Sequence, residues 1–179
     1  MLRGGGAANS RLYLYNRGNT CDSVTGGWTN VTYYSSGFNV PYHVNGSTSM
    51  YSDTGRSGCA SYIISTGKIN LSGYTKMHII YDNAEQGPSF FLCSELGTIG
   101  YMWLRSNTVS SLHIVYELYG YTKEDPTNNL STTVGIDSSH QLVTYVSINE
   151  IPSTPYHLGV FIYPKPSKVS HIYEIYLDK

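Results

Sequence analysis

Short runs in which apolar and polar side chains alternate, separated by turn residues, constrain the fold of this chain more than any other feature. Turns rich in Gly, Ser, Asn and Pro recur roughly every 8 to 15 residues, and no stretch shows a convincing helical period. The chain holds only four alanines, which also argues against much helix. The predicted strands are 12–15, 28–34, 42–44, 49–52, 60–65, 75–81, 89–94, 99–105, 111–121, 141–148, 156–163 and 170–177. About ten short strands of this kind predict an all-β fold, an antiparallel, jelly-roll-like β-sandwich with little helix.

Tyrosine is unusually frequent, with 18 residues among 179, while only 13% of residues are charged. Rings at alternate positions stand on both faces of a strand, so the core cannot take all of them. We therefore expect surplus rings on the outside of the sandwich, where they suit contact with sugars or with another chain.

Residues 1–10 are glycine-rich and predicted to form a flexible arm, and residues 11–179 a single sandwich domain. The polar segment 122–139 is predicted to be a long loop.

Charge and hydropathy exclude two classes of partner. The formal net charge is −1, and the 11 Lys and Arg residues are scattered, so binding to nucleic acid through phosphate contacts is not expected. No apolar run approaches the roughly 20 residues that span a bilayer, so membrane insertion is not expected either.

The strand 99–105 provides the strongest candidate binding surface. Alternation places Tyr101, Trp103 and Arg105 on one face and Met102 and Leu104 on the other. If Met102 and Leu104 face the core, the first set forms an outward platform of the kind that binds sugars or anchors an interface. The alternative is that the platform residues face inward while a loop covers the other two.

Two further aromatic residues are lesser candidates for the same surface. Trp28 follows Gly26 and Gly27, where an indole serves either as part of the core or as a binder at a loop tip. Tyr34 ends the same predicted strand.

The alternation of side chains also predicts the core face of two more strands. In 111–121 it places Ile114, Tyr116 and Leu118 toward the core. In the last strand the core-facing set is His171, Tyr173, Ile175 and Leu177, which leaves Glu174 and Asp178 outside.

Motifs of catalysis are absent from the sequence. It contains no HExxH, no GxSxG and no P-loop, so we expect a protein that is not an enzyme. No cofactor is expected, and the metal-binding residues, if any, stay unknown. A structural Ca²⁺ between a loop and the last strand is one hypothesis, because oxygen ligands suit this ion. Its candidate ligands are Asp22, Asp53, Glu174 and Asp178.

Several turn-and-strand motifs resemble a known group of domains. They are LYLYNRGNTC at 12–21, TGGW at 25–28, KINLSGYTK at 68–76 and IYEIYL at 172–177. Together they resemble a β-rich domain found near the C-termini of tail and other structural proteins of phages and prophages of gut Firmicutes. The resemblance implies a sandwich similar to carbohydrate-binding modules, carried on a virion that is assembled in the bacterial cytoplasm. It implies no catalytic residue.

Three functions follow as hypotheses. The first is a non-catalytic virion domain that binds host cell-surface glycans, with other virion proteins and further copies of itself as partners. The second is a purely architectural decoration or oligomerisation domain of a tail or capsid. The third is a polysaccharide-degrading enzyme, which would need two carboxylates on one groove.

Overall fold

The computed structural model describes residues 11–31, 42–53, 61–93, 96, 101–104, 108–109, 113–117, 130–136, 142–148 and 155–179. The predicted N-terminal arm, residues 1–10, lies outside this range. The described part contains fourteen strands and one helix of four residues, α1 (Asp22–Thr25). None of its helices has the length and apolar character that crossing a membrane requires.

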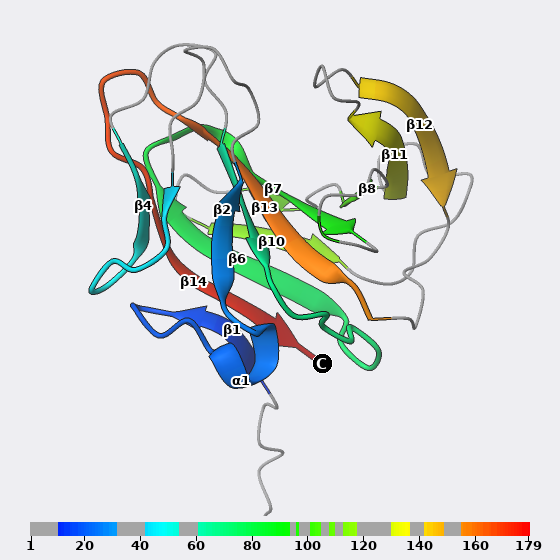
Figure 1. Ribbon diagram of the computed structural model, residues 1–179, viewed down its shortest axis with the longest axis horizontal. Coiled ribbons are helices and arrows are strands. Elements are labelled where there is room, and N and C mark those ends of the chain that lie inside the picture. Colours follow the sequence, from blue (N-terminus) through cyan, green and yellow to red (C-terminus); the bar gives the residue numbers. More distant parts are fainter. Residues whose placement is uncertain are drawn as a thin grey trace, which may run out of the picture.

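The strands form two antiparallel sheets, which confirms the predicted all-β sandwich (Figure 1). Sheet A has the order β3-β4-β14-β6-β10-β9, with β1 also paired to β14. Its strands are β1 (Leu12–Asn16), β3 (Tyr42–His43), β4 (Met50–Ser52), β6 (Lys76–Asp82), β9 (Thr108–Val109), β10 (His113–Glu117) and β14 (His171–Asp178). The first and last strands are therefore neighbours.

Sheet B has the order β12-β11-β8-β7-β13-β5-β2. Its strands are β2 (Trp28–Val31), β5 (Ser61–Ser65), β7 (Ala84–Cys93), β8 (Tyr101–Leu104), β11 (Leu130–Ile136), β12 (Leu142–Ile148) and β13 (His157–Pro164). Neighbours in either sheet are mostly distant in sequence, as the crossing connections of a jelly roll require.

The prediction of a loop over 122–139 is wrong for its second half. Strand β11 lies there and pairs with both β12 and β8. Pro126, Asn128 and Asn129 dominate the composition of the segment, but they precede the strand. The strand itself reads LSTTVGI, and its β-branched Thr and Val residues suit a pleated sheet even though the Thr hydroxyls make it polar. The short strand β9 was also missed, so the described strands outnumber the ten or so expected.

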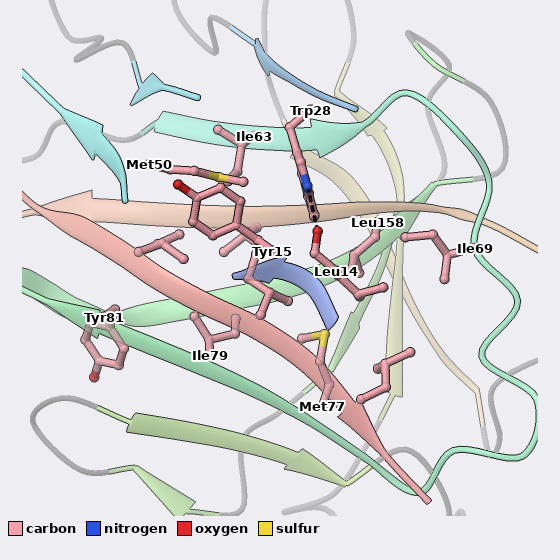
Figure 2. Close-up of a cluster of buried hydrophobic side chains, with 14 of the residues drawn as sticks. Leu14, Tyr15, Trp28, Met50, Ile63, Ile69, Met77, Ile79, Tyr81 and Leu158 are labelled. Atoms are coloured by element: carbon pink, nitrogen blue, oxygen red, sulfur yellow. Dashed lines mark hydrogen bonds between the residues drawn. The ribbon is translucent and has the colours of Figure 1, made fainter. Parts of the chain in front are cut away.

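Both sheets contribute to one hydrophobic core. Met77 and Ile79 of β6 and Ile63 of β5 are fully buried in it, as are Leu14 and Tyr15 of β1. Figure 2 shows these side chains between strands of the two sheets. Adjacent residues of a regular strand point to opposite faces, but a shift of register between Tyr13 and Tyr15 allows Leu14 and Tyr15 to share the core.

A similar irregularity corrects the predicted faces of the last strand. The register of β14 against β6 shifts between Ile172 and Glu174. Ile172 is fully buried together with Ile175 and Leu177, whereas His171 and Tyr173 are only partly buried. The prediction that His171 and Tyr173 face the core is therefore wrong, because a bulge reverses the alternation in the middle of the strand.

Buried phenols make the stability of the fold sensitive to alkaline pH. Burial raises the pKa of Tyr15, Tyr42 and Tyr81 above the usual value of about 10. The folded chain keeps these protons where the unfolded chain loses them, so their contribution is complete below about pH 10 and is lost as the pH rises through the folded pKa values. We expect the free energy of unfolding in urea to fall between about pH 10 and pH 12. As the pH rises, the phenolate absorbance of the folded protein should increase at a higher pH than that of the urea-unfolded chain. Identical titration curves for the two states would contradict this expectation.

Candidate functional site

The structure places one predicted binding residue in the core. The indole of Trp28 is 7% exposed, and its Nε1 donates a hydrogen bond to the backbone oxygen of Leu14 at 3.0 Å (Figure 2). An indole held in this way offers no face to a ligand, so Trp28 belongs to the core, as the alternative interpretation stated. Tyr34 and Arg105 lie outside the described residues.

The other two predicted residues, Tyr101 and Trp103, lie on strand β8 of sheet B. Met102 pairs with Leu92 of β7, which pairs with Leu158 of β13, and Leu158 is fully buried in the core. Tyr101 and Trp103 occupy the alternate positions of β8. Their side chains are not described, so both their exposure and their role in binding stay predictions. Ile64 of β5 lies in register with Trp103 through β13 and β7 and is 3% exposed, and its neighbour Ile63 is fully buried, so both faces of sheet B are covered near β5.

The outer face of sheet A carries a row of rings that sequence analysis did not bring together. His43 stacks on Tyr51 with 4.7 Å between ring centroids, Tyr51 lies 6.4 Å from His171, and His171 stacks on Tyr173 at 5.5 Å. We call these four residues the His–Tyr row. They come from β3, β4 and β14, which pair side by side, so cross-strand pairing explains the stacking. All four side chains are exposed or partly buried.

A carboxylate is fixed beside one end of this row. Asp82 ends β6 opposite His171. The backbone N–H of His171 donates to Asp82 Oδ1 at 3.1 Å, and the Tyr173 hydroxyl donates to Oδ2 at 2.9 Å. Burial, followed by this hydrogen bond, raises the pKa of Tyr173, so the phenol keeps the proton that it donates. Ser49 Oγ lies 2.9 Å from Nδ1 of His171 and fixes that ring as well.

A second group of side chains occupies the same face farther along β14. His78 stacks on Tyr176 with ring centroids 4.5 Å apart, and Tyr13 lies 5.5 Å from Tyr176 on the other side. The Arg11 guanidinium lies 3.8 Å from the Tyr176 ring centroid and pairs with Asp178 at 3.1 Å. The outer face of sheet A thus combines rings with charged groups over much of its length.

The four acidic residues proposed for Ca²⁺ do not fit one site. Asp53 pairs with His43 at 2.8 Å, Glu174 with Arg17 at 2.7 Å, and Asp178 with Arg11. Within the described ranges, no group of three or more His, Cys, Asp or Glu residues is placed to hold a metal ion. Glu174 and Asp178 do lie outside the core, as predicted, but each neutralises an arginine.

The sequence held one signal for the His–Tyr row. His43, Tyr51, His171 and Tyr173 all lie in or next to predicted strands, and His and Tyr at alternate positions were visible in the last one. The sequence does not show that β4 and β14 are neighbours. Ser52 and Ser170, whose backbones hydrogen-bond there, lie 118 positions apart.

The sequence matches no protein-family model and no curated protein. Among solved structures, the fold is similar to the carbohydrate recognition domain of Emp47p, with 12% identity, coverage of 98% of this chain and 99% of that one, and a TM-score of 0.43. A Bacillus licheniformis β-glucanase is 14% identical, with coverage of 97% and 100% and a TM-score of 0.42. The exoplasmic/lumenal domain of VIP36, bound to Ca²⁺ and Man3GlcNAc, is 11% identical, with coverage of 84% and 82% and a TM-score of 0.41. Likenesses this low transfer neither a ligand nor a reaction to this chain.

Proposed function

We propose that this domain is a non-catalytic module that binds glycans through the ring-bearing outer faces of its sheets. The observation that carries the proposal is the His–Tyr row: four rings, one exposed and three partly buried, with the fixed carboxylate of Asp82 on the outer face of sheet A. Sugars present apolar C–H faces and a rim of hydroxyls, and rings with nearby hydrogen-bonding groups match both. On sheet B, the register of Tyr101 and Trp103 supports a second platform, to which Arg105 would belong.

The place of such a module is a separate proposal. The sequence resemblance supports a position on a phage virion and a role in contacting the host surface. Many copies on one particle would compensate for weak binding at each site, because linked sites raise the effective concentration of the ligand.

Truncation of the row should weaken binding. We expect Tyr51→Ala and Tyr173→Ala each to lower the affinity for a bound polysaccharide about threefold to tenfold, as expected for the loss of one ring contact. Trp103→Ala tests the platform on sheet B in the same way. The measurement is isothermal titration calorimetry against the glycan found on an array, and Tyr74→Ala, outside both surfaces, is the control. Unchanged affinity in all three variants would contradict the proposed surfaces, and an array without a hit would contradict glycan binding.

One alternative deserves a direct comparison. Tyr and Arg on an ordered face are also the composition of a protein interface, so the same surface fits an architectural domain that pairs with neighbouring subunits. Light scattering separates the two. A stable oligomer in which Tyr51 and Tyr173 become protected supports the architectural role, and a monomer with an accessible row supports glycan binding.

A further inference from the structure

The His–Tyr row contains two stacked pairs, in which each ring gives one face to its partner, and the pairs meet at a tilted contact between Tyr51 and His171. Interplanar angles are 24° between His43 and Tyr51 and 14° between His171 and Tyr173. Side chains stand roughly perpendicular to a sheet, so rings stacked in this way present their edges and polar atoms to solvent. A sugar can therefore use only the remaining ring faces and edges, and it depends on hydrogen bonds as well as on stacking.

Asp82 is the carboxylate at the His171–Tyr173 end of the row. Within the described ranges, Asp82 accepts from two neutral donors, the His171 amide and the Tyr173 hydroxyl. Each carboxylate oxygen can accept more than one hydrogen bond, so both keep capacity for a ligand. The two donors also fix the plane of the carboxylate, which removes part of the entropy cost of binding.

In the part of the chain that the structure describes, three cations lie on turns that hydrogen-bond to Tyr173 or to Asn83, next to Asp82. Arg17 pairs with Glu174 at 2.7 Å. Lys165 and Lys168 lie in the turn whose backbone bonds to Asn83, and their side chains are exposed. Among the described residues, no Lys or Arg forms an ion pair with Asp82.

We propose that Asp82 is the specificity-determining residue of the glycan site, and that it binds two neighbouring hydroxyls of a neutral sugar. This inference rests on the proposed function and names the class of sugar. Hydroxyls donate to a carboxylate in charge-assisted bonds, which are stronger than neutral ones. A uronate, sialate or phosphodiester would instead bring a second negative charge to the same place.

Affinity electrophoresis in polysaccharide gels tests this assignment. The probes are dextran, mannan and galactan as neutral polymers, polygalacturonate and hyaluronate as acidic ones, and chitosan as a cationic one. We expect at least one neutral polymer, and neither acidic one, to retard the protein. Asp82→Asn should reduce that retardation about tenfold or more, the usual effect of losing a charged hydrogen-bond partner. The control Asp22→Asn removes a carboxylate from the first turn of α1, where Oδ1 lies beside Gly27, and should have no effect.

The outcomes separate the two proposals. Retardation by neutral polymers that Asp82→Asn leaves unchanged overturns the role of Asp82 while glycan binding stands. Preference for an acidic polymer, or for chitosan alone, overturns the neutral class. Absence of retardation in every gel overturns the proposed function itself.

Because Asp82→Asn also weakens two internal hydrogen bonds, a melting curve accompanies it. If the variant is unfolded, a competition experiment on the wild-type protein replaces it, in which glycosides that each lack one hydroxyl compete with the polymer. Loss of inhibition when either of two neighbouring hydroxyls is missing supports the assignment, and equal inhibition by every glycoside overturns it.

Discussion

Trp28→Ala is expected to lower the free energy of unfolding by about 3–5 kcal/mol, the usual cost of truncating a buried indole. The side chain lies in the core beside Leu14, and the substitution removes its packing and the hydrogen bond from Nε1 to the Leu14 oxygen. That oxygen would then be a buried acceptor without its partner, which adds to the cost of the cavity. Urea unfolding followed by circular dichroism measures the change.

Trp28→Phe separates the two contributions. It keeps a six-membered ring in the core and removes the donor together with the rest of the five-membered ring, so we expect a smaller loss of about 1–3 kcal/mol. Glycan binding by the folded fraction of either variant should be unchanged, because Trp28 offers no surface to a ligand. Loss of binding at unchanged stability would indicate that Trp28 contacts the ligand and would contradict its place in the core.

Alternation predicted a core face for β8 and β10, and the backbone register agrees with it. Met102 and Leu104 lie in register with the buried Leu158 and Val160 through β7, and Ile114 and Tyr116 pair with the buried Ile79 and Met77. Because the side-chain period of a strand is two, a regular strand in this register would carry its hydrophobic residues toward the core, which stays a prediction for these side chains.

Alternation failed where the strand itself is irregular. The bulge in β14 moves His171 and Tyr173 to the outer face, where they form half of the His–Tyr row. A bulge depends on how a strand pairs with its neighbour, so no local pattern reveals it. The site was missed for the same reason: Asp82 meets Tyr173 only through the pairing of β6 with β14.

The turn after β1 is expected to be nearly as sensitive as the core. Gly18 has a φ of +95°, and a Cβ built there would lie 2.3 Å from the backbone oxygen of Ser47. Ser47 belongs to the connection between β3 and β4, which carry His43 and Tyr51, so this contact joins the first turn to the hairpin of the His–Tyr row. An alanine adds both the strain of a left-handed backbone and a clash with main chain that cannot rotate away.

Gly73→Ala is the matched control for this clash. Gly73 has a φ of +85°, but a Cβ there meets nothing within 4 Å. We expect Gly73→Ala to cost about 1 kcal/mol from backbone strain alone, and Gly18→Ala about 3 kcal/mol from strain and overlap together. Urea unfolding gives both values, and a Gly18→Ala variant as stable as Gly73→Ala would show that the two turns are not in contact. If they are in contact, Gly18→Ala should also weaken glycan binding, since the hairpin must shift to relieve the overlap.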